Sequence, residues 1–202
     1  NSKDRIFFAA GACMLTSRKV LKEVGLPDTT FLMYDDADLG WRIRLRGYEV
    51  LFVPTARVMH RGSMTLAQSE LSEKRLAQSV YEHFAMILEN FSLPMILRVL
   101  PQVLCLRIVR LFSLVAGRKL RLATATVAGM ARVLRLLRVV WKKRMFVQRR
   151  IRRVSDSHIV GLMEQLSPDP TVIGELHIAS VQIRLLSHRE HVVFRVRKIR
   201  SF

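Results

Sequence analysis

Acidic residues are missing from the middle of this chain. Residues 91–155 contain 16 Lys and Arg and no Asp or Glu, and so supply +16 of the formal net charge of +18. Residues 1–90 and 156–202 are each close to neutral, at +1. Asn, Ser and Pro also interrupt two helical patterns near residues 90–94. We therefore expect three regions: 1–90, a cationic module at 91–165, and a tail at 166–202.

Cysteine and long apolar runs are scarce as well. The two cysteines, Cys13 and Cys105, exclude a disulfide-rich scaffold, and we expect both to be buried and reduced in a cytosolic protein. The longest uncharged stretch of the cationic module, residues 122–131, is far shorter than the ~18 to 20 residues that cross a bilayer. Its helices are therefore expected to lie in a membrane interface rather than to pass through a membrane.

The most informative stretch is residues 34–42, which read Tyr-Asp-Asp-Ala-Asp-Leu-Gly-Trp-Arg. Repulsion within such a cluster raises the pKa of one carboxyl group, which suits a general base, and carboxylates also hold divalent cations. The alternative is an acidic helix N-terminus favoured by the helix dipole, with Arg42 and Arg44 pairing back at helical spacing. The flanking sequence has to decide between them.

Hydrophobic spacing and end signals predict the local structure of residues 1–90. We expect strands at 5–15 and 49–53, and helices at 17–24, 36–46 and 65–89. Ser17 is the expected N-cap of the first helix, and Gly47 is the expected stop of the second.

Five segments, in order, resemble the second half of the catalytic domain of inverting family-2 glycosyltransferases, the GT-A group with rhamnosyl- and galactofuranosyltransferase-like enzymes. They are residues 8–15, 18–28, the acidic element at 31–39, the Arg-rich helix end at 42–48, and the Val-Pro to His-Arg-Gly-Ser segment at 53–63. Asp35 departs from the family's usual Glu. The resemblance implies an α/β fold: the C-terminal half of a GT-A, Rossmann-like domain, followed by basic amphipathic helices and a short tail that is either a β-hairpin or disordered.

The same resemblance places a nucleotide-binding half, with an Asp-x-Asp metal motif, upstream of this chain. No Asp-x-Asp precedes Phe8, and residues 36–38 occupy the position of the family's base. We therefore expect a C-terminal fragment of a longer enzyme, inactive alone.

The resemblance also assigns roles to individual residues. Asp36 matches the catalytic base, which takes the proton of an acceptor hydroxyl during inverting transfer from a nucleotide-diphosphate sugar. His60 matches a ligand of Mn²⁺ or Mg²⁺, although a lone His after a strand is often structural. The residues expected to bind the acceptor or support the base are Asp35, Asp38, Trp41, Arg42 and Gly11. For Trp41, a place in the core is the alternative.

Helices are expected in the cationic module at 97–116, 119–138 and 139–154. Arg132, Arg135 and Arg138 alternate with aliphatic residues, which predicts one cationic and one apolar face. This pattern favours an anionic membrane surface, on the cytoplasmic face of the cell membrane, with Trp141 and Phe146 as anchors.

Two other readings of the module remain: an ordinary helical bundle with solvated arginines, and nucleic-acid binding, for which no recognised motif is present. A lipid-linked glycan acceptor would explain the membrane module. The rival function is a non-catalytic membrane-surface scaffold with a degenerate transferase fold.

Overall fold

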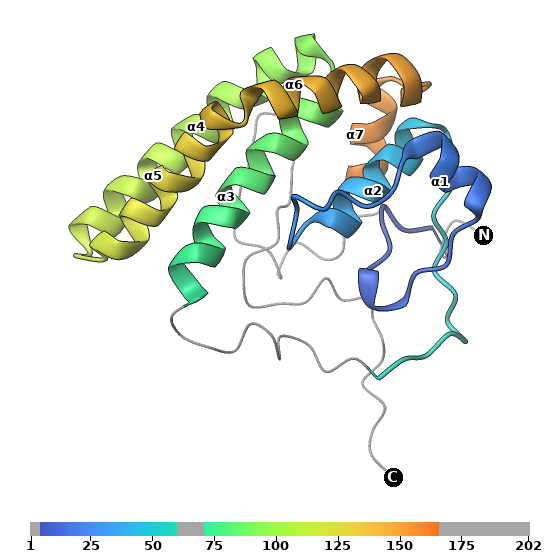
Figure 1. Ribbon diagram of the computed structural model, residues 1–202, viewed down its shortest axis with the longest axis horizontal. Coiled ribbons are helices and arrows are strands. Elements are labelled where there is room, and N and C mark those ends of the chain that lie inside the picture. Colours follow the sequence, from blue (N-terminus) through green and yellow to red (C-terminus); the bar gives the residue numbers. More distant parts are fainter. Residues whose placement is uncertain (1–4, 60–70, 166–202) are drawn as a thin grey trace.

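The computed structural model describes residues 5–59 and 71–165 of the 202-residue chain. Figure 1 shows the short helices α1 and α2 near the N-terminus and a group of longer helices beside them, with α4 and α5 extending together toward the opposite end. The elements in chain order are η2 (Gly11–Cys13), α1 (Arg18–Val24), α2 (Asp35–Leu45), α3 (Leu71–Asn90), α4 (Leu93–Ala116), α5 (Leu120–Arg135), α6 (Leu137–Phe146), the π-helical turn η4 (Val147–Ile151) and α7 (Asp156–Gln165).

The expected α/β, Rossmann-like fold is wrong, because the described part of the chain is largely helical and contains no strand. The two segments expected as strands, 5–15 and 49–53, show β-pairing only at an isolated antiparallel bridge between Arg5 and Leu51. A strand needs a neighbour along its length to satisfy its backbone groups. Beyond the bridge, the first segment instead lies across α2, where Phe7 packs edge to face on Trp41 with ring centroids 6.1 Å apart.

Arg44 shows how these two segments are held without a sheet. Its buried guanidinium donates hydrogen bonds to the carbonyl oxygens of Ile6 and Val50, the second at 3.0 Å. The backbone N–H of Ile6 donates to the Val50 oxygen at 3.0 Å. A side chain of α2 therefore satisfies carbonyl groups that a β-ladder would otherwise pair.

The helix signals of this region are confirmed. Ser17 caps α1, and its Oγ accepts a hydrogen bond from the backbone N–H of Val20 at 3.2 Å. After α2 the chain turns at Gly47, whose φ of +93° lies in the region that favours glycine. The expected helix at 65–89 is present as α3 from residue 71, and residues 65–70 lie outside the described part.

The helices of the cationic module pack onto α3. α3 makes its most extensive contact with α5, and a Cβ added to Gly129 of α5 would lie 2.5 Å from the Ala77 carbonyl oxygen of α3. The three helices expected here are present as α4, α5 and α6. α7 was not predicted. One hydrophobic core joins residues of α2, α3 and α6, and the division into domains near residue 90 stays a prediction.

The outer face of α4 is apolar and exposed. We call this face the α4 stripe; its residues recur every three or four positions and are Leu97, Pro101, Cys105, Ile108, Phe112 and Val115. Leu97 and Phe112 are 68 % and 70 % exposed. By length and composition, α4 is also long and apolar enough to cross a membrane. Only 11 % of its most apolar stretch is buried. The sequence criterion of an unbroken uncharged run did not identify α4, because spaced arginines interrupt its apolar sequence.

Both cysteines are free, as expected, but both are exposed. Cys13 ends the short helix η2, and Cys105 lies on the outward side of α4, so neither apolar run is buried at its cysteine. The expectation of two buried thiols is wrong.

Candidate active site

The carboxyl group of Asp36 sits in the first turn of α2 and is half-buried. Its Oδ2 accepts a hydrogen bond from the backbone N–H of Gly11 at 3.1 Å, and its Oδ1 accepts one from Ala37 at 2.7 Å. Burial, with a smaller contribution from Asp35, nevertheless raises the pKa of Asp36 above the usual value for aspartate. No Lys or Arg of the described residues forms an ion pair with it. An oriented carboxylate with a raised pKa has the properties of a general base.

Gly40 brings the segment that carries Gly11 onto α2. A Cβ added to Gly40 would lie 2.2 Å from Cβ and 2.8 Å from Cα of Phe8, so only glycine fits this close approach. Sequence reasoning missed this role, although an isolated glycine inside a helical pattern is a known signal for close packing. The contact between Gly11 and Asp36 thus depends on a glycine one turn further along α2.

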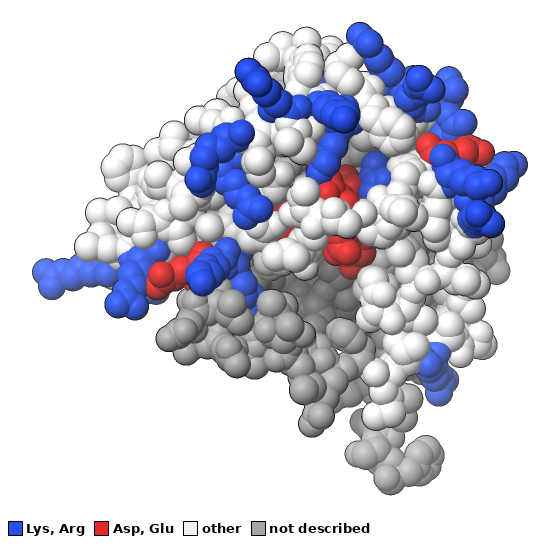
Figure 2. Space-filling model, in the orientation of Figure 1, with Lys and Arg blue, Asp and Glu red and all other residues white. Residues whose placement is uncertain are grey.

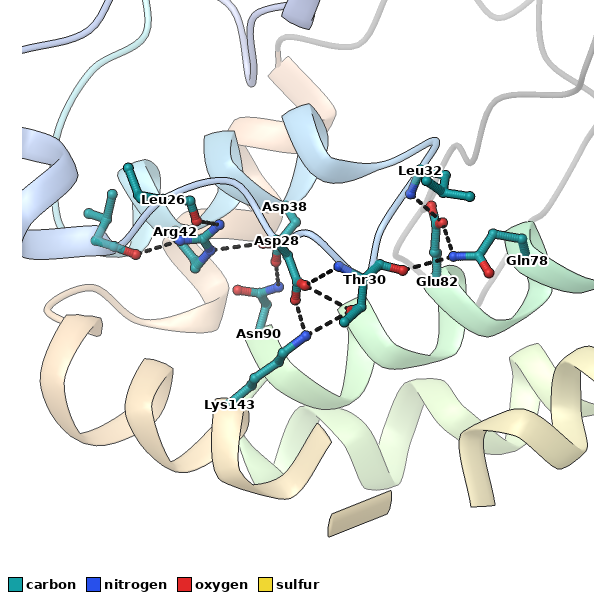
Figure 3. Close-up of polar contacts among 11 residues, drawn as sticks. Leu26, Asp28, Thr30, Leu32, Asp38, Arg42, Gln78, Glu82, Asn90 and Lys143 are labelled. Carbon is teal, nitrogen blue, oxygen red and sulfur yellow. Dashed lines mark hydrogen bonds and ion pairs between the residues drawn. The ribbon is translucent and has the colours of Figure 1, made fainter. Parts of the chain in front are cut away.

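Glu82 of α3 holds the backbone that leads into α2. Its fully buried carboxylate accepts hydrogen bonds from three consecutive N–H groups, those of Leu32 at 2.6 Å and of Met33 and Tyr34 at 3.0 Å each. Gln78, one turn earlier on α3, donates to Glu82 and to the Thr30 carbonyl oxygen (Figure 3). Glu82 therefore fixes where the acidic helix begins. Nothing in the sequence pairs it with a loop about 50 residues away.

Asp38 and Arg42 have structural partners. The buried Asp38 carboxylate accepts from Arg42 Nε at 2.8 Å and from Asn90 Nδ2 at 2.8 Å. The remaining nitrogens of Arg42 donate to the carbonyl oxygens of Val24 and Leu26, at 2.5 and 3.0 Å (Figure 3). Arg42 thus anchors the turn after α1 to α2. Of the three clustered carboxylates, Asp38 is the one that the fold itself uses.

Trp41 belongs to the core. Its side chain is 2 % exposed and packs edge to face against Phe91 of the α3–α4 connection, with ring centroids 4.7 Å apart. The ring therefore has no free face on which a sugar could stack, and the core alternative describes its position.

A second polar cluster joins the region of the acidic motif to α6. Lys143 of α6 forms an ion pair with Asp28 and donates to Thr30 Oγ1 at 2.9 Å (Figure 3). Burial opposes ionisation of Asp28, but the hydrogen bonds from Lys143 and Thr30 outweigh it and lower the pKa of this carboxyl group. A residue of the cationic module therefore holds the turn that precedes the acidic motif.

A cavity of about 270 Å³ lies beside this cluster, between the turn after α1 and helices α2, α3 and α6. Glu89 lines it, is 2 % exposed, and has one carboxyl oxygen without a hydrogen-bond partner. Burial, and then the nearby Asp38, raise the pKa of Glu89 to about 8, so this group is largely neutral at pH 7. Sequence reasoning did not single out Glu89, because its environment comes from four separate elements.

The predicted metal ligand, His60, lies outside the described residues. Within residues 5–59 and 71–165, no group of three or more His, Cys, Asp or Glu is placed to hold a metal ion. Asp35 and Asp36 are adjacent carboxylates, but two groups do not form a metal site by themselves. The described residues therefore do not form a divalent metal site on their own.

Comparisons with known proteins give one match. Searches against curated proteins and against solved structures find no match. Residues 1–84 match the family described as Glycosyltransferase like family 2. The matched part includes α1, α2 and most of α3, and thus Gly11, Asp36 and Glu82. This match supports a glycosyltransferase family 2 domain in residues 1–84.

Proposed function

We propose that the chain carries the acceptor-activating site of an inverting glycosyltransferase of the rhamnosyl- or galactofuranosyltransferase type, with Asp36 as the general base. The observation that carries the proposal is the environment of Asp36: its carboxyl group is half-buried, is oriented by the Gly11 N–H, has a raised pKa, and forms no ion pair with a Lys or Arg of the described residues. The family match over residues 1–84 supports a glycosyltransferase in general and contains both residues.

The proposed reaction moves one proton and exchanges one bond. The acceptor hydroxyl gives its proton to a carboxylate oxygen of Asp36 as its own oxygen attacks the anomeric carbon of the sugar. The bond from that carbon to the nucleoside diphosphate breaks on the opposite face, and the diphosphate leaves with the electron pair. The Gly11 N–H keeps the carboxylate oriented, and the negative charge of Asp35 supports its basicity.

The proposed partners are a nucleotide-diphosphate sugar as donor and a glycan or lipid-linked glycan as acceptor. We also propose that the protein is peripheral at the cytoplasmic face of the cell membrane. The α4 stripe, next to a module with no acidic residue in 91–155, supports this position. Figure 2 shows Lys and Arg spread widely over one face of the molecule, with few Asp or Glu among them.

The experiment that tests Asp36 is transfer by the full-length protein with a panel of nucleotide-sugar donors. Asp36→Asn should lower turnover about 10²- to 10⁴-fold, since the base is lost while the shape is kept. Glu73→Gln, at a partly exposed position of α3 where the side chain lies 4.0 Å from the exposed Arg121, is the control and should leave turnover unchanged. Turnover that survives Asp36→Asn would place the base elsewhere. Absence of turnover with every donor, together with firm vesicle binding, would favour the scaffold function.

A divalent metal bound partly by His60 remains part of the proposal, as an ion that would neutralise the departing diphosphate. A chelator should abolish transfer, and Mn²⁺ or Mg²⁺ should restore it. His60→Ala should raise the metal concentration needed for half-maximal turnover. Full activity in a chelator would remove the metal from the proposal.

A further inference from the structure

Arg107 of α4 is a half-buried cation whose hydrogen-bond partner is neutral. Its Nη2 lies 2.7 Å from Nδ1 of His83 on α3. Burial of the imidazole, and then the charge of Arg107, lower the pKa of His83 to about 3, so His83 is uncharged at neutral pH and its Nδ1 accepts the hydrogen bond. The contact therefore orients the guanidinium without compensating its charge.

No carboxylate among the described residues forms an ion pair with Arg107. Its neighbour one turn along α4 is another cation, Arg110; burial and then Arg110 lower the pKa of Arg107. A partly buried guanidinium beside a second cation is unfavourable unless an anion joins them. The planar fork of arginine suits the oxygens of a phosphate group.

The position of Arg107 adds two facts about such an anion. Arg107 lies between Cys105 and Ile108 of the α4 stripe in the sequence of α4, so the exposed apolar face on which a hydrocarbon chain could lie is adjacent to it. It also lies toward Tyr34, the residue directly before the acidic cluster, because Arg107 and Tyr34 contact residues one turn apart on α3. The Tyr34 hydroxyl contacts Ser79, one turn before His83 on α3. The site therefore lies between an exposed apolar surface and the start of α2.

We propose that Arg107 and Arg110 bind the phosphate group of a lipid-linked acceptor, and that the hydrocarbon chain of this lipid lies along the α4 stripe. This inference rests on the proposed function, because it names the class of acceptor that Asp36 would activate. Phospholipid headgroups and the diphosphate of the donor offer the same oxygen chemistry, so the test must separate these sources.

The test measures binding of the protein to phosphatidylcholine vesicles. One set contains a long-chain polyprenyl monophosphate, a second contains phosphatidylglycerol at equal surface charge, and a third contains the uncharged polyprenol. The double variant R107Q/R110Q should bind the polyprenyl phosphate vesicles at least about tenfold more weakly than the parent protein, as expected for loss of charge-assisted hydrogen bonds. Its binding to the other two sets should change much less.

The matched control is R118Q/K119Q, which removes the same charge from the exposed turn between α4 and α5. It should weaken binding to both anionic vesicles by a similar, smaller factor. Equal losses for the two double variants would overturn the proposal in favour of general attraction to the surface. A loss for R107Q/R110Q that is as large with phosphatidylglycerol would assign the site to phospholipid headgroups. Loss of affinity for free pyrophosphate, with vesicle binding unchanged, would assign it to the donor.

Stability distinguishes a binding role from a structural one. Arg110→Gln keeps the hydrogen bond between Arg107 and His83 and removes one of two adjacent cations, so it should leave Tm unchanged or raise it, whereas a lower Tm would mean that Arg110 supports the fold. Arg110→Gln alone, at an exposed position, should still weaken binding to polyprenyl phosphate and keeps the test valid if the double variant does not fold. Because binding is read without turnover, failure of Asp36 as the base would leave this result intact, and the two failures can be told apart.

Discussion

The buried arginines of α2 and the half-buried Arg107 of α4 have different kinds of partner. Arg42 and Arg44 of α2 end on a carboxylate or on carbonyl oxygens of the surrounding backbone. Arg107 of α4 ends on a neutral imidazole and has another cation, Arg110, beside it. Arg42 and Arg44 therefore have their partners within the fold, although Arg44 Nε has no hydrogen-bond partner, and this arrangement indicates groups that stabilise the fold. A cation with no opposite charge beside it among the described residues indicates a group whose partner comes from outside.

The same contrast appears between two carboxylates of one helix. Asp38 is buried and paired with Arg42 and Asn90, whereas Asp36, two residues earlier, accepts only backbone hydrogen bonds and has a raised pKa. Their positions in the sequence, two residues apart in one helix, do not explain this difference. Because successive helical residues point about 100° apart, one faces α3 and the other faces the segment of Gly11.

The largest expected change in stability comes from replacing Asp38, and it tests the difference between Asp38 and Asp36. Asp38→Asn would leave the buried Arg42 without its counter-charge, and should lower the free energy of unfolding by about 3 to 5 kcal/mol. Asp36→Asn should leave stability unchanged or slightly higher, because burial already disfavours the ionised form of Asp36. Urea unfolding at pH 7 measures both. Equal losses in the two variants would show that Asp36 is as structural as Asp38.

A second expected effect concerns Glu82, the partner of the chain before α2. Glu82→Ala would leave the N–H groups of residues 32–34 without their acceptor, and should cost about 3 kcal/mol or more. Glu73→Ala, at the partly exposed start of the same helix, should change stability by less than about 0.5 kcal/mol. A small loss at Glu82 would mean that the loop finds other partners.

A smaller loss of stability is expected from adding a side chain at Gly40, where α2 lies close to Phe8. Gly40→Ala should cost about 1 to 3 kcal/mol, since its Cβ would overlap Phe8, and should reduce transfer by moving Gly11 from Asp36. Gly161→Ala in α7 is the matched control, because nothing lies within 4 Å of the added Cβ. That variant should be up to about 1 kcal/mol more stable. Similar results at both sites would remove the steric role of Gly40.

The smallest effect is a pH dependence at Glu89. Its folded pKa of about 8 lies above the unfolded value of 4.5, so the folded state keeps a proton that the unfolded state has lost. The stabilising contribution is complete below about pH 4.5 and is lost as the pH rises toward 8. Glu89→Gln cannot ionise, so its stability relative to the parent should increase by about 1 kcal/mol between pH 5 and pH 6. An unchanged difference would show that Glu89 ionises normally.

The parts of the structure that could be predicted depend on local interactions. Ser17 caps α1, Gly47 ends α2, and the apolar spacing of the cationic module gives helices in the expected places. The strands predicted at 5–15 and 49–53 are not formed in the described structure, because a strand forms only where a neighbour pairs with it along its length. The buried Arg44 satisfies the carbonyl oxygens of Ile6 and Val50 instead.

In the candidate site too, some residues could be identified from the sequence and others only from the tertiary structure. The acidic cluster and its flanking segments, read from the sequence alone, singled out Asp36 and Gly11, and both lie in the part that matches a glycosyltransferase family. Glu82, Glu89 and the pair of His83 and Arg107 were out of reach of that reading. Their partners lie some 25 to 60 residues away, and burial sets their charge states.

The sequence by itself determined where the helices run, which third of the chain is cationic, and which carboxylate cluster is the candidate site. Only the tertiary structure decided that Asp38 and Arg42 belong to the fold, that Trp41 belongs to the core, and that Arg107 has no carboxylate partner within residues 5–59 and 71–165. The physical reason is that the cost of a charge depends on its solvent exposure and on its neighbours, and both are established only when distant segments pack together.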